Sequence, residues 1–109
     1  MKLLTKKIRD KLISNHQKQD GTKTFNAELK LFNPTGMGTW YISELNQEPN
    51  KAFGLCDLYE QEFGYVSIDE LQSIKLPFGL GIERDKFFQP KAFQDIIFNI
   101  NKQDNIQAR

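Results

Sequence analysis

The chain has 109 residues, a hydrophobic fraction of 39% with nine Phe residues, and a formal net charge of +1. This length and composition predict a single domain over residues 1–109 and exclude a disordered chain. No apolar run approaches the roughly 20 residues that span a bilayer, and charged residues at 9–11 interrupt the N-terminal segment too early for a signal peptide. We therefore expect a cytoplasmic protein with no membrane partner.

Charge is distributed unevenly along the chain. Residues 1–23 hold seven Lys or Arg against two acids, residues 24–74 hold two against eight, and residues 75–109 hold six against four. The basic residues near the N-terminus are Lys2, Lys6, Lys7, Arg9 and Lys11. They suit contacts with a phosphate backbone, but the simpler interpretation is that they form the solvated face of an amphipathic helix.

The first predicted element is a helix that begins after an N-cap at Thr5 and ends near Asn15. Its apolar residues recur at helical spacing: Leu4, Ile8, Leu12 and Ile13. The polar residues 15–21 that follow predict a solvated loop, and this loop contains the only histidine, His16.

Four strands are expected next, at residues 22–32, 39–45, 52–58 and 62–66. The first alternates apolar and polar residues, and the second is rich in β-branched and aromatic residues. The turn-forming residues between them predict a hairpin. Gly64 within the fourth strand indicates a β-bulge or another backbone passing close by.

The C-terminal third begins with a capping box, in which Ser67 and Glu70 have the S-x-x-E spacing of a helix start. We predict a short helix at residues 68–74, a strand at 80–84, and a last helix after Pro90. The apolar stripe of that last helix is Phe93, Ile96, Ile97 and Ile100. The polar tail from about residue 101 is expected to fray.

The predicted order is α-β-β-β-β-α-β-α. Short connections between successive strands favour antiparallel pairing. The expected architecture is α+β, a curved antiparallel sheet of about five strands with helices packed on one face.

The best candidate for a functional cluster is Glu83-Arg84-Asp85. In a strand, the two carboxylates point to one face, where they could bind a metal or share a proton, and Arg84 points to the other. The competing interpretation is an edge strand with solvated charges, in which Arg84 pairs with Glu70 or Glu62. No further residue completes a metal site, so none is predicted.

Aromatic residues supply the second group of candidates. Trp40 and Tyr41 are adjacent on a predicted strand and face opposite ways, so one belongs to the core and the other lies on the outer face. An exposed aromatic beside Tyr65 or Phe63 would anchor a partner or stack a base; alternatively, helices cover both. Cys56 lies in an apolar run that is typical of a buried, inert thiol.

Six segments of the chain carry a family resemblance. They are M-K-L-L-T-K at residues 1–6, F-N-P-T-G at 32–36, T-W-Y at 39–41, F-G-L at 53–55, E-F-G-Y-V-S-I-D-E-L at 62–71 and P-F-G-L-G-I-E-R-D at 77–85. Together they resemble a family of small bacterial and plasmid- or phage-borne proteins catalogued only as a domain of unknown function. The resemblance implies a single-domain protein often encoded on mobile elements, and it brings no reaction, cofactor or catalytic residue.

Three functions remain open from the sequence. Because no phosphate loop, zinc motif or nucleophile elbow is present, we expect a non-catalytic interaction protein with a protein partner and no cofactor. Its context on mobile elements suits an inhibitor of host defence, and its acidic middle segment could imitate nucleic acid. The alternatives are a nucleic-acid-binding accessory protein that uses Lys6, Lys7, Arg9 and Lys11, and a metal-dependent hydrolase that uses Glu83 and Asp85. The oligomeric state stays open.

Overall fold

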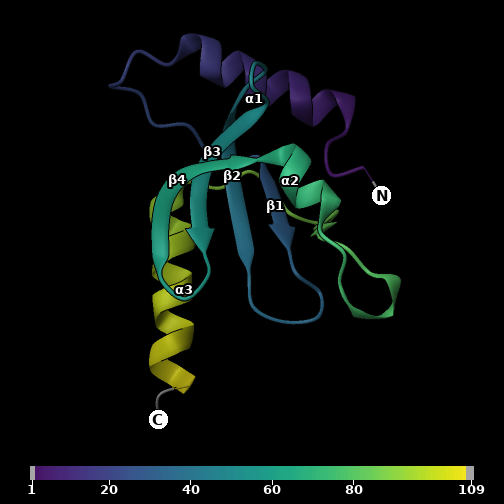
Figure 1. The fold of residues 1–109 in the computed structure, drawn as a ribbon. Helices are drawn as coiled ribbons and strands as arrows, with labels where there is room; N and C mark the ends of the chain where they lie inside the picture. Colours follow the sequence, from purple (N-terminus) through teal and green to yellow (C-terminus); the bar gives the residue numbers. More distant parts are fainter. Residues whose placement is uncertain (1, 108–109) are drawn as a thin grey trace.

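The computed structural model describes residues 2–107 of the chain (Figure 1). Its elements follow in the order α1 (Lys6–Lys18), β1 (Leu29–Phe32), β2 (Thr39–Asn46), β3 (Lys51–Asp57), β4 (Gln61–Ser67), α2 (Ile68–Ser73), the 3₁₀-helix η1 (Pro77–Gly79), β5 (Glu83–Arg84) and α3 (Phe93–Gln107). Apart from the 3₁₀-helix, this is the order predicted from the sequence.

The strands form one antiparallel sheet with the order β4-β3-β2-β1-β5. The first four strands are neighbours in the sheet as well as in the chain, and β5 returns to the far edge beside β1. The α+β class and the antiparallel sheet of five strands are therefore confirmed for the described residues.

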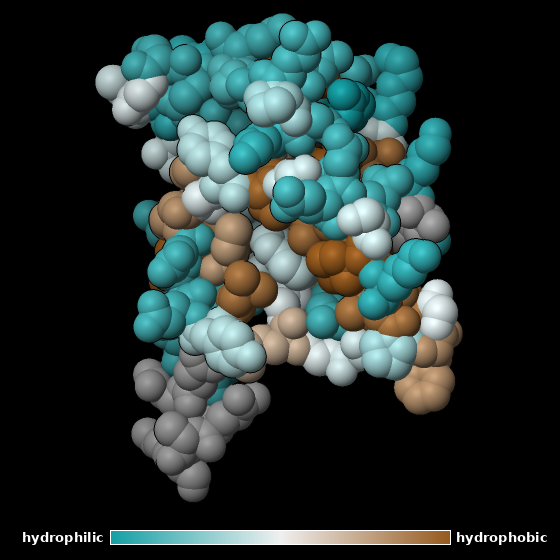
Figure 2. All heavy atoms as spheres, in the orientation of Figure 1, coloured by the Kyte–Doolittle hydropathy of each residue, from teal (hydrophilic) through white to brown (hydrophobic). Residues whose placement is uncertain are grey.

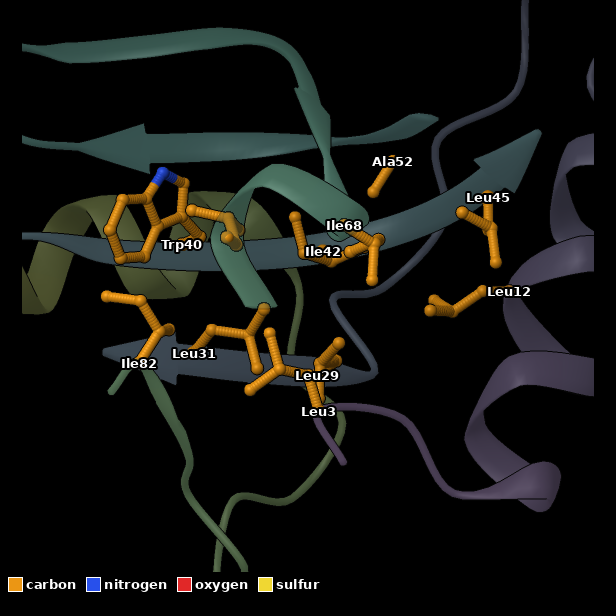
Figure 3. Packing of buried hydrophobic residues seen from close by; sticks show 11 residues of the cluster. Leu3, Leu12, Leu29, Leu31, Trp40, Ile42, Leu45, Ala52, Ile68 and Ile82 are labelled. Carbon is orange, nitrogen blue, oxygen red and sulfur yellow. The ribbon is translucent and has the colours of Figure 1, made fainter. Parts of the chain in front are cut away.

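The larger core lies on one face of the sheet, which α1 and α2 cover. Figure 3 shows Leu12 of α1, Ile68 of α2 and Ile42 of β2 contributing to the same buried layer. Burying one such side chain stabilises the fold by roughly 1.5–3 kcal/mol. This layer joins both helices to the central strands.

The opposite face of the sheet is also covered, and this corrects the prediction that the helices pack on one face. Phe93 and Ile96 of α3 form a second buried cluster with Leu55 of β3, and Tyr41 of β2 packs against it. Figure 1 shows α3 behind β4, whereas α2 lies in front of the sheet. The physical reason is that β2 is apolar on both faces, because Trp40 joins the first core and Tyr41 the second.

Helix α1 begins as predicted and ends later than predicted. The Thr5 hydroxyl accepts a hydrogen bond of 3.2 Å from the backbone N–H of Ile8, which confirms the N-cap. The helix continues to Lys18, so His16 lies in its last turns and the expected loop at 15–21 is wrong for residues 15–18. Tertiary contacts extend it, because Asn15 is buried against the sheet.

The irregularity expected at Gly64 occurs instead in the middle of the sheet. Gly64 pairs regularly with Gly54, and a Cβ on Gly64 would meet no atom within 4 Å. The register of β2 with β3 shifts between Ile42 and Glu44, so Ser43 is the extra residue of a β-bulge. A Cβ on Gly54 would overlap the carbonyl oxygen of Tyr41, so Gly54 is the glycine that a close backbone approach requires.

Three other boundaries differ from prediction. Strand β1 begins only at Leu29, and before it a lone bridge joins Ala27 to Lys91. Strand β5 is shorter than the expected 80–84, because only Glu83–Arg84 pair with β1. The preceding Pro77–Gly79 form a 3₁₀ turn. Helix α3 remains helical to Gln107, through most of the polar tail for which fraying is expected; residues 108–109 lie outside the described range.

In the part of the chain between residues 2 and 107, no helix combines the length and apolar character needed to cross a membrane.

Candidate functional site

Strand β4 forms one edge of the sheet. It pairs with β3 along its whole length, and among the described residues no strand pairs with its other side. Alternate residues of an antiparallel edge strand turn their N–H and C=O groups away from the sheet. The seven-residue strand therefore presents a row of backbone donors and acceptors that can receive another extended chain.

Two aromatic side chains project from this edge toward the α3 face of the sheet. Phe63 and Tyr65 are 50% and 69% exposed. Phe63 stacks on Phe53 of β3 at 6.0 Å between ring centroids and meets Phe93 of α3 edge-on at 5.0 Å. Tyr65 lies 5.2 Å from Phe53 in a tilted arrangement. The rings are thus fixed on one side by packing and open to solvent on the other.

A hollow of about 370 Å³ lies beside these rings. Its lining residues are Gln19, Gly21, Lys23, Thr24, Phe25, Ser43, Glu44, Phe53, Phe63, Tyr65 and Phe93. This volume is within the range of small-ligand pockets, and five of the eleven lining residues are aromatic. We call it the Glu44 pocket.

Glu44 supplies the carboxylate of this pocket, although it belongs to a central strand and is only 7% exposed. The β-bulge at Ser43 turns Glu44 to the same face as its register partner Phe53. The Gln19 side-chain amide donates a hydrogen bond of 2.9 Å to Glu44 Oε2, and His16 Nδ1 lies 3.8 Å from Oε1. The C-cap residue of α1 therefore holds the carboxylate through one hydrogen bond, and His16 of the last turn lies nearby.

The other predicted aromatic candidates do not form an exposed site. Trp40 is 8% exposed and belongs to the core shown in Figure 3. Tyr41 is half-buried, with its ring centroid 6.0 Å from that of Phe88 and 5.8 Å from Lys30 Nζ. Burial raises the pKa of the Tyr41 phenol above its ordinary value, with smaller contributions from Asp57 and Asp85. Of the predicted aromatics, Tyr65 is the one that the structure leaves exposed beside Phe63.

The Glu83-Arg84-Asp85 cluster is engaged with the fold. Arg84 Nη1 donates hydrogen bonds to the carbonyl oxygens of Lys2 at 2.9 Å and Leu3 at 3.2 Å, so its partners are backbone groups and not Glu70 or Glu62. Asp85 accepts a hydrogen bond of 2.9 Å from the N–H of Phe87 and lies 3.8 Å from Lys30 Nζ. The side chains of Glu83 and Asp85 do line one open hollow of the surface.

In the folded protein, basic residues of the N-terminal segment lie beside two basic residues from later in the chain. Lys2, Lys6 and Arg9 line a hollow of about 510 Å³ together with Arg84 and Lys86, which come from the other end of the sequence. Lys6 is also bound to Asp10 at 2.9 Å, and this hydrogen bond raises the pKa of the Lys6 ammonium. Figure 2 shows that the end of the molecule where α1 lies is hydrophilic.

Lys7 and Lys11 lie on the exposed side of the same helix. They differ from Lys2, Lys6 and Arg9 in that they do not line the basic hollow. The predicted nucleic-acid residues are therefore divided between the hollow and the outer face of α1.

Two further predicted features have clear positions. Cys56 is half-buried against the larger core, and burial, with a smaller effect of Glu62, raises the pKa of its thiol. Within residues 2–107, no group of three or more His, Cys, Asp or Glu side chains is arranged to hold a metal ion. Glu83 and Asp85 thus have no third ligand among the residues described.

Sequence reasoning missed Glu44 and Phe53 as site residues. Nothing in the sequence marks the β-bulge at Ser43, without which a regular β2 would place Glu44 on the other face of the sheet. One signal could have indicated the edge: residues 52–74 contain five acids and no Lys, Arg or His. This acidic run covers most of β3 and all of β4 and α2.

Comparison with known proteins gives a family without a known activity. The family profile described as "Protein of unknown function (DUF2958)" matches residues 3–103. No curated protein and no solved structure matches the chain. Because the match covers nearly the whole sequence, including the first turns of α3 that the resemblance left out, the chain belongs to the DUF2958 family of proteins of unknown function.

Proposed function

We propose that this protein is a binding module that takes an extended segment of a partner protein along the outer edge of β4. The observation that carries the proposal is the pair of exposed rings, Phe63 and Tyr65, on a strand whose outer side is unpaired among the described residues. In strand addition, backbone hydrogen bonds supply affinity and pockets for alternate side chains supply specificity. The unpaired edge of β4 offers the backbone hydrogen bonds, and its solvent-facing aromatic rings offer a surface that distinguishes one side chain of a partner from another.

Charge supports a partner segment that is basic. The five acids of residues 52–74 lie on β3, β4, α2 and the turn between the two strands, with no basic residue among them. Glu60, Glu62, Asp69 and Glu70 are exposed. A like-charged edge also opposes pairing of two copies through β4, because equal charges then meet across the junction.

The proposal is tested by selecting peptides from a random phage library on the immobilised protein and measuring the affinity of a selected peptide. We expect the double variant Phe63→Ser/Tyr65→Ser to weaken binding at least about tenfold, since aromatic anchors dominate such interfaces. The matched control is Phe78→Ser/Phe87→Ser, because both rings are almost fully exposed and lie outside β4. Hydrogen exchange should show new protection at amides of residues 61–67 when the peptide is bound.

Three outcomes would overturn the proposal. One is a selected peptide that binds the β4 variant and the control variant equally well. Another is peptide binding with protection elsewhere and none at β4. The third is a wild-type dimer in sedimentation velocity that the β4 variant converts to monomer, because the occupant of the edge would then be a second copy of the chain.

The resemblance noted in the sequence implies that such proteins are often encoded on mobile elements, and this expectation suggests a narrower form of the proposal. A partner drawn from host defence would fit such a context, with the acidic edge of the sheet resembling the charge of nucleic acid. Pull-down from bacterial lysate with the wild-type chain and with Phe63→Ser/Tyr65→Ser as the paired bait tests this form. The narrower form predicts that the wild-type bait recovers a host-defence protein and that the variant bait does not.

A second candidate function is binding of a nucleic-acid phosphate backbone at the basic hollow. The observation in its favour is that Arg84 and Lys86 join Lys2, Lys6 and Arg9 around one space. Such binding weakens steeply as salt rises, because phosphate contacts release counterions. Fluorescence anisotropy with labelled single- and double-stranded 20-mers at about 50 and 200 mM salt would detect it.

The variant pair for this candidate is Lys2→Ala/Lys86→Ala against Lys7→Ala/Lys11→Ala, whose residues lie outside the hollow. The candidate predicts a larger loss and a shallower salt slope for the first pair. An equal loss of nucleic-acid affinity in both variant pairs would assign binding to the general charge of α1. If the wild type gives no anisotropy change at the lower salt, the candidate function is wrong.

A further inference from the structure

We infer that the Glu44 pocket accepts a cationic side chain, Lys or Arg, from the segment that docks on β4. The inference rests on the proposed function and names the residue chemistry that this docking would select. The pocket adjoins the edge directly, because Phe63 and Tyr65 of β4 form part of its lining. A side chain on the α3 face of an added strand would therefore lie next to the opening.

The first argument is the carboxylate itself. Removing a carboxylate from water costs several kcal/mol unless hydrogen bonds or a cation compensate. A carboxylate can accept about four hydrogen bonds, and the structure gives Glu44 one of 2.9 Å from Gln19. His16 Nδ1 at 3.8 Å from Oε1 is beyond hydrogen-bond distance. Glu44 therefore retains acceptor capacity within the pocket that it lines.

The second argument is the kind of wall around the carboxylate. Aromatic faces attract ammonium and guanidinium groups through their quadrupole, most strongly when the cation is shielded from water. Phe25, Phe53, Phe63, Tyr65 and Phe93 all line the pocket. A carboxylate that is almost fully buried among aromatic rings offers both an ion-pair partner and cation–π surfaces to one side chain.

The basic and polar groups that face Glu44 come from α1 with its C-cap and from the loop that follows. His16 and Gln19 belong to α1 and its C-cap, and Lys23 belongs to the loop that follows. The Gln19 amide also donates to the carbonyl oxygen of Lys23 at 2.8 Å, which holds this loop at the rim. Among the described residues, the basic side-chain nitrogen within 4 Å of the Glu44 carboxylate is His16 Nδ1 at 3.8 Å, so the ammonium of Lys23 does not occupy the carboxylate.

The test uses N-acetyl-arginine and N-acetyl-lysine methylamides, with the neutral norleucine derivative as control, in NMR titrations of the full chain. We expect both cationic probes to shift resonances of residues 19–25, Glu44 and Phe53 with millimolar affinity, and norleucine to give no saturable shift. Glu44→Gln keeps the shape and the acceptor for Gln19, and it should weaken the cationic probes at least fivefold. His16→Gln removes the competing imidazole and should leave their affinity equal or higher.

A second arm uses a peptide selected on β4 in which each Lys or Arg is replaced in turn by norleucine. One position should lose at least fivefold in affinity on the wild type and little on Glu44→Gln. If peptides bind β4 without such a position, and the free cationic probes shift nothing in the pocket, the inference is wrong while the docking proposal stands. If no peptide depends on Phe63 and Tyr65, the docking proposal fails, and probe binding at Glu44 alone would then identify a site for free cationic molecules.

Discussion

The side-chain amide of Asn15 donates a hydrogen bond of 2.9 Å to the backbone carbonyl of Ser43, the extra residue of the β-bulge. Asn15 is 2% exposed, so this bond is made inside the protein. It connects the last turns of α1 to the point where β2 changes register. Because the same bulge directs Glu44 to the α3 face, the contact links helix packing to the candidate pocket.

Replacing Asn15 by Ala should lower the free energy of unfolding by about 2–3 kcal/mol. The change leaves a buried carbonyl without its donor and adds a small cavity. Chemical denaturation measures the loss, and Asn26→Ala is the control because Asn26 is exposed. A loss no greater than that of the control would show that the bulge does not depend on Asn15.

Adding one methyl group at each of two paired glycines should have opposite effects. Gly54→Ala should destabilise by at least about 3 kcal/mol, because the new Cβ would overlap the Tyr41 carbonyl. Gly64→Ala, at the register partner, should be neutral or stabilising by roughly 0.4–1 kcal/mol, since space is free and the unfolded chain loses entropy. Thermal and urea unfolding of both variants decides this, and equal effects would contradict the close approach of Gly54 to the Tyr41 carbonyl.

Removing the Arg84 side chain should loosen the N-terminal segment. Arg84→Ala deprives the carbonyls of Lys2 and Leu3 of a charged donor, and we expect a loss of about 1–3 kcal/mol in the free energy of unfolding. Hydrogen exchange should increase at residues 3–6 before it increases elsewhere. Lys86→Ala is the neighbouring control, and a similar loss there would point to general charge and not to these bonds.

Alkaline pH should destabilise the protein in part through Tyr41. Burial raises the folded-state pKa of this phenol above its ordinary value of 10, so the folded protein holds the proton more tightly than the unfolded chain. The corresponding stability is complete below about pH 10 and is lost as pH rises through the folded-state pKa. Urea unfolding between pH 8 and 11 should show a smaller decline for Tyr41→Phe than for the wild type. Tyr59→Phe, at an exposed tyrosine, should decline like the wild type.

Local signals in the sequence predicted most of the elements. Thr5 and Ser67 act as N-caps at the expected helix starts, because a cap involves only the next three residues. The apolar spacing of residues 93–100 correctly identified the buried face of α3, since one face of a helix meets one surface. The length of α1 was underestimated because polar residues at its end are stabilised by tertiary contacts that no local pattern contains.

The sequence alone determined the α+β class, the order of the elements and the acidic character of residues 52–74. These follow from residue type, spacing and charge, which act over short distances along the chain. Only the tertiary structure decided that α3 covers the second face, that Arg84 binds the N-terminal backbone, and that Glu44 enters an aromatic pocket. Each of these depends on contacts between distant segments, and Glu44 depends in addition on one extra residue in β2, which changes the face of every side chain after it.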